Sequence, residues 1–168
     1  MQNETVGYPQ NILNLSNNEF IKLGKDYIED TRWARSSKPF FIDKMPNNFF
    51  HIGLIKLILP NSKIIDARRN PLDGCFSCFK QYFAKGQHFT YDLDDIARYY
   101  KDYLRLMDFW NSLYPDAIYT AQYEHIISNP ETEIKSLLKY CNVDFEDSCL
   151  EFYKSNRPVK TASSEQVR

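Results

Sequence analysis

Glycine is scarce in this sequence, which has five in 168 residues and no two of them clustered. Phosphate-binding loops of the Walker type need closely spaced glycines and a following lysine, because their backbone must approach the phosphates closely. No Gly-x-x-x-x-Gly-Lys run occurs in the sequence. This chain therefore lacks the loop that defines a P-loop phosphotransferase.

Cysteine is also scarce, with four residues in the chain. So few cysteines do not predict a dense disulfide framework. The spacing Cys75-x-x-Cys78 is one that redox and zinc sites use. The pair falls inside a predicted helix, however, and neither a second pair nor a histidine cluster completes a tetrahedral set. We therefore expect no metal.

The chain has no excess of positive charge, since 21 basic and 22 acidic side chains leave a formal net charge of -1. This balance argues against a general nucleic-acid binder. No apolar run is long enough to span a bilayer, and residues 1–15 are polar and lack the hydrophobic region of a signal peptide. We expect no nucleic-acid or membrane partner and a reduced, cytoplasmic location.

Hydrophobic residues make up 43% of the chain and aromatic residues 15%, which is enough for a core. Helical periodicity and capping residues predict helices over about 16–35, 46–59, 70–83, 93–113, 130–141 and 145–153, with a short turn over 123–127. Short apolar runs bounded by breakers predict strands over about 38–43, 63–68 and 117–121. Strands that alternate with helices indicate an α/β fold with a parallel sheet.

Three strands are few for a parallel sheet, which is normally covered on both faces and flanked by further strands. The organisation therefore predicts that part of the sheet is missing from this chain.

The ends of the predicted strands carry polar and charged side chains. Lys44 follows the first strand, Arg68-Arg69-Asn70-Pro71 ends the second, and Gln122-Tyr123-Glu124 ends the third. Ligands of open α/β sheets bind at the carboxyl ends of the strands. Asn70 and Pro71 suit a helix start whose dipole favours an anion, and arginine donates two parallel hydrogen bonds to a phosphate. The sequence therefore predicts a phosphate or sulfate site at this edge.

Several motifs, taken in their order and spacing, resemble the sulfotransferase family. The similarity is greatest to the bacterial branch often fused to tetratricopeptide repeats and related to tyrosylprotein sulfotransferases. It covers most of the chain from about Tyr8 onward. The motifs are Asp43-Lys44-Met45-Pro46-Asn47-Asn48-Phe49, Leu59-Pro60-Asn61-Ser62-Lys63-Ile64-Ile65, Arg69-Asn70-Pro71-Leu72-Asp73 with Ser77, Tyr123-Glu124, Asn129-Pro130 and Thr161-Ala162-Ser163-Ser164-Glu165-Gln166-Val167-Arg168.

The resemblance implies an enzyme that transfers a sulfuryl group from 3′-phosphoadenosine-5′-phosphosulfate (PAPS), its co-substrate, to an unknown hydroxyl or amine acceptor. Arg69 and Ser77 match the pair that binds the 3′-phosphate. Tyr123 matches a tyrosine beside the adenine. Lys44 matches a catalytic lysine that stabilises the sulfuryl group in transit, and Ser163 matches a catalytic serine near the bridging phosphate and sulfate.

The chain departs from the family in one respect. The family holds the 5′-phosphosulfate in a glycine-rich loop after its first strand, and this sequence contains nothing similar. The resemblance therefore implies a single sulfotransferase domain over residues 1–168, truncated at both ends. Its fold would be a partial P-loop-type three-layer fold, with a short parallel sheet flanked by helices and without the first strand and phosphosulfate loop. A tetratricopeptide-repeat region would precede it in a full-length protein.

Two alternatives stay open from the sequence. One is a truncated, non-catalytic module that binds nucleotide or a partner chain, and the absent loop favours it for this polypeptide. The other is a fragment of a P-loop-type phosphotransferase that uses the same sheet edge. The absent loop also predicts that this chain alone binds PAPS weakly and does not turn over.

Overall fold

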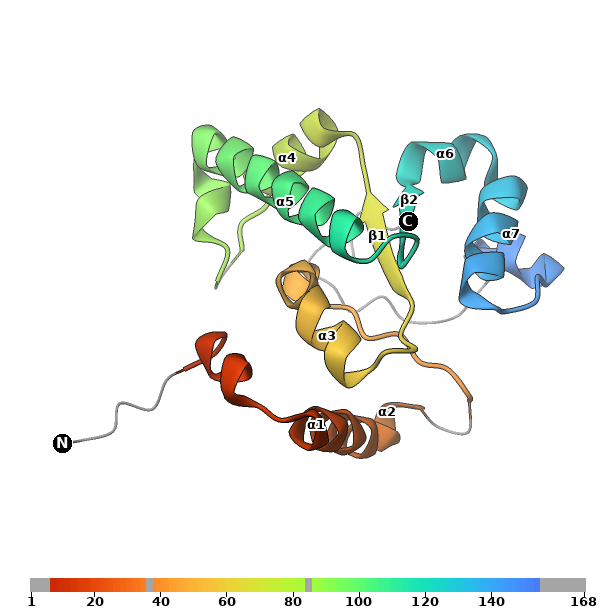
Figure 1. Cartoon of the computed structure of the whole chain (residues 1–168). Helices are drawn as coiled ribbons and strands as arrows, with labels where there is room; N and C mark the ends of the chain where they lie inside the picture. The colour runs from red at the N-terminus through yellow and green to blue at the C-terminus, as the bar shows by residue number, and fades with distance from the viewer. Residues whose placement is uncertain (1–6, 36–37, 84–85, 155–168) are drawn as a thin grey trace. The chain divides into compact units, whose positions relative to one another are not determined.

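The computed structural model describes residues 7–35, 38–83 and 86–154 (Figure 1). The chain divides into two compact units, Met1–Ser62 and Lys63–Arg168, which we call the N-terminal and C-terminal units. That the whole chain forms one sulfotransferase domain stays a prediction.

Short helices make up the N-terminal unit. α1 begins at a capping box, in which the Ser16 hydroxyl accepts the Glu19 N–H and the Glu19 carboxylate accepts the Ser16 N–H. This confirms the predicted helix start at about residue 16, and of the two candidate caps, Ser16 and Asn17, it is Ser16 that caps the helix. The elements are η1 (Gln10–Asn14), α1 (Asn17–Asp30), α2 (Arg32–Arg35), η2 (Pro46–His51) and α3 (Ile52–Ile58).

A glycine allows the two longest helices of this unit to pack closely. Gly24 is buried in the middle of α1, and a Cβ placed on it would lie 2.0 Å from the carbonyl oxygen of Ile58, the last residue of α3. Any side chain at this position would overlap the α3 backbone. The close approach of α1 and α3 therefore depends on Gly24.

The prediction of a strand over 38–43 was wrong. Residues 38–43 form no strand, and no described strand pairs with them. Phe41 stacks on Tyr27 of α1 at 6.4 Å between ring centroids, and Asp43 accepts a 2.5 Å hydrogen bond from the Tyr27 hydroxyl. Phe40 and Ile42 are 64% and 89% exposed. An apolar run makes a strand only when a neighbouring strand takes its backbone hydrogen bonds, and this run packs on a helix instead.

The C-terminal unit contains a two-stranded parallel sheet, with Ile64 paired to Ile118 at its start and Arg68 to Gln122 at its end. The α/β class with a short parallel sheet flanked by helices is therefore confirmed. The elements are β1 (Ile64–Arg68), α4 (Pro71–Lys80), η3 (His88–Tyr91), α5 (Leu93–Leu113), β2 (Ile118–Gln122), α6 (Tyr123–Ser128), α7 (Pro130–Cys141), η4 (Asp147–Leu150) and η5 (Phe152–Lys154).

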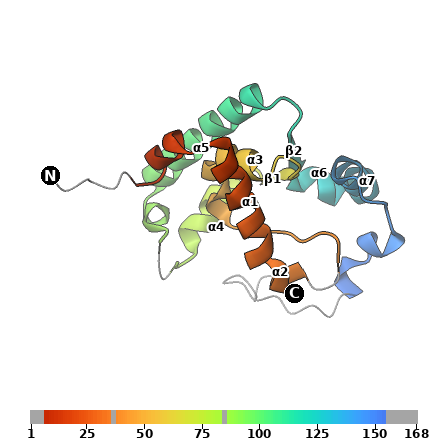
Figure 2. The ribbon, with the colours of Figure 1, turned by 60° about the horizontal axis from the view of Figure 1, so that its bottom comes forward.

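Helices pack against both faces of this sheet, and Ile65 of β1, on the face of Tyr119, stays 43% exposed. Side chains alternate between faces along a strand, so Asp66 and Tyr119 point to opposite faces of the paired strands. Tyr103 of α5 donates a 2.6 Å hydrogen bond to Asp66, and Tyr140 of α7 packs on Tyr119 with ring centroids 5.3 Å apart. Figures 1 and 2 show α5 and α7 on opposite sides of the two strands. Ile96, Met107 and Ala121 are the buried hydrophobic residues described in this unit.

The starts of the two strands are joined by one side chain. The Tyr140 hydroxyl accepts the Ile64 N–H at 3.2 Å and lies within donating distance of the Ala117 and Ile64 carbonyl oxygens, at 2.6 and 3.1 Å. Tyr140 therefore ties α7 to the amino ends of both β1 and β2. Over the described ranges, no helix is long and apolar enough to cross a membrane.

The helix contact at Gly24 can be tested with Gly24→Ala. The added methyl group would overlap the Ile58 carbonyl, and overpacking of this kind costs about 1–3 kcal/mol. We expect a lower urea midpoint of unfolding. Gly74→Ala in α4 is the matched control, because a Cβ there meets nothing within 4 Å and alanine favours a helix by about 0.5–1 kcal/mol. Equal midpoints for the two variants would contradict the proposed close approach.

Candidate functional site

Both strands run into helices at the same end of the sheet. Arg68 pairs with Gln122 as the last residues of β1 and β2, and α4 and α6 follow within three residues (Figure 1). This is the carboxyl edge at which α/β sheets bind ligands. Arg69 and Tyr123, two of the predicted site residues, are the first residues after the two strands.

The structure brings Arg69 and Tyr123 together. The guanidinium carbon of Arg69 lies 5.4 Å from the centroid of the Tyr123 ring, within the range of a cation–π contact. Tyr123 remains 49% exposed. The stacked ring orients the arginine without neutralising its charge.

Arg69 differs from the other arginines that the structure describes. It donates no hydrogen bond and forms no ion pair with any described residue, whereas each of the others has an acceptor. The partners are Glu29 for Arg32, the Ile28 carbonyl for Arg35, Asp66 for Arg68, Asp95 for Arg98 and Asp102 for Arg105. Arg69 is therefore the guanidinium among them that is available to an anionic ligand.

The first turn of α4 has already used its backbone donors. Asn70 is the predicted N-cap, and its side-chain oxygen accepts the N–H groups of Leu72 and Asp73 at 3.0 and 3.3 Å. Pro71 has no N–H group, and the Asn70 N–H is donated to Glu124 at 2.8 Å. The sequence predicted that this helix start favours an anion. In the structure, the start of α4 can attract an anion only through the helix dipole, because its backbone N–H groups are already bonded. Side chains must therefore provide the hydrogen bonds to a ligand.

Glu124 is a site residue for which the sequence assigned no role. One carboxylate oxygen accepts the Asn70 N–H and the other accepts from the Gln122 side-chain amide. The Asn70 N–H, then the Gln122 amide, and also the charge of Arg69 lower the pKa of the Glu124 carboxyl below its ordinary value. The signal in the sequence was an acidic residue in the first turn of a helix after a strand, where the dipole favours negative charge.

Ser77, the second predicted phosphate ligand, lies on the second turn of α4 and is half-buried. Residues three and four apart share a helix face, so Asn70, Gly74 and Ser77 lie along one face of α4. A Cβ on Gly74 would meet nothing within 4 Å, and the Ser77 hydroxyl makes no hydrogen bond with the described residues. This face therefore offers an unused hydroxyl next to open space.

Lys44 lies in the other unit, where the structure leaves it exposed and without an ion pair to the residues it describes. Its neighbour Asp43 is fixed by the Tyr27 hydroxyl, and burial together with this hydrogen bond raises the pKa of Tyr27 to about 12. The segment before Lys44 is thus anchored to α1. Ser163, the second predicted catalytic residue, lies outside the described residues.

Arg68, in contrast to Arg69, points to the α5 face of the sheet. It pairs with Asp66 at 2.6 Å and stacks over the Tyr103 ring at 5.6 Å. Burial and the hydrogen bond to Asp66 raise the pKa of Tyr103. Arg68 therefore has a structural ion pair, whereas Arg69 has none among the described residues.

The Cys75-x-x-Cys78 pair lies within α4, as predicted. Burial raises the pKa of both thiols, which keeps them protonated and weakly nucleophilic at neutral pH. Across the part of the chain that the structure describes, no three His, Cys, Asp or Glu side chains converge as a metal site would require.

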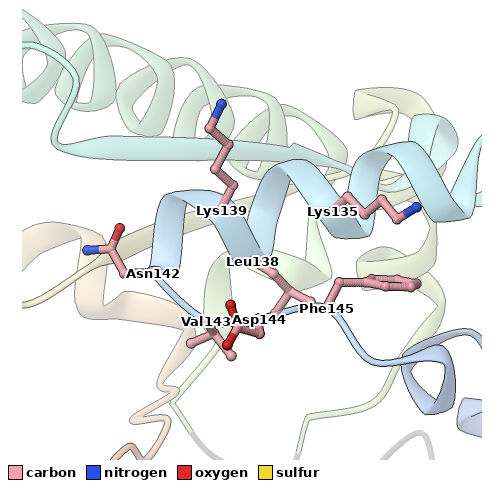
Figure 3. A pocket seen from close by; sticks show the side chains of 7 residues that line it. All are labelled: Lys135, Leu138, Lys139, Asn142, Val143, Asp144 and Phe145. Carbon is pink, nitrogen blue, oxygen red and sulfur yellow. The ribbon is translucent and has the colours of Figure 1, made fainter.

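An open pocket of about 480 Å³ lies at the end of α7, away from the predicted site residues in sequence (Figure 3). Two lysines line it, and Lys135 stacks over Phe145 at 4.8 Å and pairs with Glu131 at 2.5 Å. The carboxyl end of a helix disfavours anions. The dipole of α7 therefore does not assist phosphate binding in this pocket. Its lining residues are Lys135, Leu138, Lys139, Asn142, Val143, Asp144 and Phe145.

Comparisons with known proteins identify the family of the chain. The sequence profile described as the sulfotransferase family matches residues 3–147, and the chain belongs to that family. It is 38% identical over 169 residues to an uncharacterised protein of Aquifex aeolicus (strain VF5). The match covers 98% of this chain but only 22% of that relative's length. No solved structure matches the chain significantly.

The lowered pKa of Glu124 predicts a pH-dependent contribution to stability. A carboxyl whose pKa is lower in the folded than in the unfolded chain stabilises the fold while ionised, and this contribution is lost as the pH falls through the folded-state value. We expect Glu124→Gln to have a lower urea midpoint than the wild type at pH 7. The difference should shrink below pH 4.5, the ordinary value for this group. A difference that stays constant from pH 7 to pH 3.5 would contradict this assignment.

Proposed function

We propose that the C-terminal unit binds the 3′-phosphate of PAPS through Arg69 and Ser77. The observation that carries the proposal is the state of Arg69, which has no acceptor among the described residues, unlike the other described arginines. It follows directly after β1 at the ligand-binding edge of the sheet. A phosphate dianion would accept two hydrogen bonds from the guanidinium and one from the Ser77 hydroxyl.

Tyr123 is proposed to contact the adenine. Tyr123 is 49% exposed as a residue and Arg69 lies over one face of its ring, so aromatic surface remains for a base. Base–aromatic stacking tolerates any base, because every base has a π face. The contact would add affinity, while Arg69 would select ligands with a 3′-phosphate.

The proposed activity is transfer of a sulfuryl group to a hydroxyl or amine acceptor. PAPS supplies the group, and the protein's part is to place cations where negative charge develops. From the resemblance, Lys44 is proposed to stabilise the sulfuryl group during transfer, and Ser163 is proposed to lie near the bridging phosphate and sulfate. A base must take the acceptor's proton. Cytoplasmic location and an upstream tetratricopeptide-repeat region stay predictions.

Nucleotide binding without turnover is the second candidate. Arg69, Ser77 and Tyr123 all belong to the C-terminal unit, whereas Lys44 belongs to the other. The proposed binding residues therefore all lie within one compact unit. Release of 3′-phosphoadenosine-5′-phosphate (PAP) by the chain incubated with PAPS and simple hydroxyl and amine acceptors would favour the enzyme, and it would overturn the prediction that this chain alone does not turn over.

The phosphate assignment can be tested by titrating the chain with PAP up to millimolar concentration and following the thermal midpoint. Loss of a charged hydrogen-bonding partner costs about 2–5 kcal/mol, so we expect Arg69→Ala to weaken PAP binding about thirtyfold or more. Ser77→Ala should weaken it less, because it removes one neutral hydrogen bond.

Two controls make the test specific. Arg98→Ala removes one exposed positive charge from α5 and should bind PAP like the wild type. Adenosine 5′-phosphate lacks the 3′-phosphate and should not distinguish Arg69→Ala from the wild type. Equal PAP-induced shifts in Arg69→Ala and the wild type, or no shift in either, would refute the assignment.

A further inference from the structure

Residues 122–124 make two contacts with the turn that carries Arg69. The Tyr123 ring lies under the Arg69 guanidinium, and one Glu124 carboxylate oxygen holds the Asn70 N–H at 2.8 Å. The Gln122 amide holds the other oxygen. The first turn of α6 thus contacts both the side chain of Arg69 and the backbone N–H of Asn70.

These contacts join elements that are distant along the chain. Asn70 and Glu124 are 54 residues apart, and the register of the strands brings them side by side after the Arg68–Gln122 pair. On the other side of Arg69, Arg68 is fixed by its ion pair with Asp66. The backbone that carries Arg69 is therefore fixed both before and after it.

A carboxylate so near an unpaired arginine would ordinarily form an ion pair with it. Glu124 is close enough for the charge of Arg69 to influence it, yet no ion pair forms between these two described residues. One Glu124 oxygen accepts the Asn70 N–H and the other accepts the Gln122 amide, and these two hydrogen bonds set the orientation of the carboxylate. Gln122 therefore helps to keep Glu124 from neutralising the guanidinium.

We propose that Glu124 is a positioning residue for the nucleotide site, and that it prepares Arg69 for phosphate by fixing the Asn70 backbone while Gln122 holds its second oxygen away. The proposal rests on the proposed function, because it concerns how Arg69 is prepared to receive a 3′-phosphate. Fixing the arginine beforehand reduces the entropy that ligand binding would otherwise cost. Glu124 itself does not touch the ligand.

The experiment compares Glu124→Ala with the conservative Glu124→Gln. The glutamine side chain keeps an oxygen that can accept the Asn70 N–H, whereas alanine does not. The first readout is the NMR shift of the Arg69 side-chain protons in the ligand-free protein, which the Tyr123 ring current displaces. The second is the PAP affinity of each variant.

We expect Glu124→Ala to lose most of the ring-current shift of Arg69 and to bind PAP roughly tenfold more weakly, as is typical of coupled neighbours. Glu124→Gln should keep the shift and bind PAP within about twofold of the wild type. Gln122→Ala frees one Glu124 oxygen to pair with Arg69, so PAP affinity should fall in this variant.

Several outcomes would overturn the proposal. One is a Glu124→Ala variant that is less stable but keeps the Arg69 shift and PAP affinity, because Glu124 would then be structural only. Another is equal losses in Glu124→Gln and Glu124→Ala, which would assign the effect to charge. If Glu124→Ala does not fold, Glu124→Gln decides, and loss of the Arg69 shift in it refutes the proposal. A wild type that does not bind PAP instead refutes the proposed function, because the ring-current readout needs no ligand.

Discussion

The parallel pairing of β1 with β2 is the constraint on which the C-terminal unit depends. Two short strands make a weak sheet by themselves. Here, hydrogen bonds from side chains outside the strands join β1 to β2 at both ends of the sheet. The Tyr140 hydroxyl joins the amino ends, and Glu124 joins the turn after β1 to the turn after β2. With the register fixed in this way, the residues that follow the strands cannot slide relative to each other, and Arg69 stays over Tyr123.

Much of the local structure could be predicted from the sequence, because its causes are local. Ser16 with Glu19, and Asn70 before Pro71, specify helix starts through neighbouring residues alone. The prediction of a strand over 38–43 was wrong because the formation of a strand depends on contacts that are distant in the sequence. An apolar run becomes a strand only if a distant segment pairs with it, and Phe41 and Asp43 contact Tyr27 instead. The role of Glu124 was missed because its main partner lies 54 residues away.

The helix start at Asn70 shows how satisfied hydrogen bonds change the meaning of a sequence motif. An Asn-Pro cap before a helix indicates an anion site when its N–H groups are free. Here the cap serves the helix itself, because Asn70 accepts two of the N–H groups and Glu124 takes a third. The Asn70-Pro71 cap that marks the site thus leaves it without free backbone donors in the first turn of α4. Side chains must therefore provide the selectivity for an anionic ligand.

Arg68 and Arg69 are adjacent, yet the strand gives them different environments. Arg68 is the last residue of β1, shares a face with Asp66 and is neutralised under Tyr103 of α5. Arg69 lies one residue beyond the strand, where the nearby carboxylate of Glu124 is already held by N–H donors. An arginine without an ion pair has none to break before it binds a phosphate, although the charge of Glu124 still acts on Arg69. The position of the strand end, rather than the residue type, therefore separates a structural arginine from one available to a ligand.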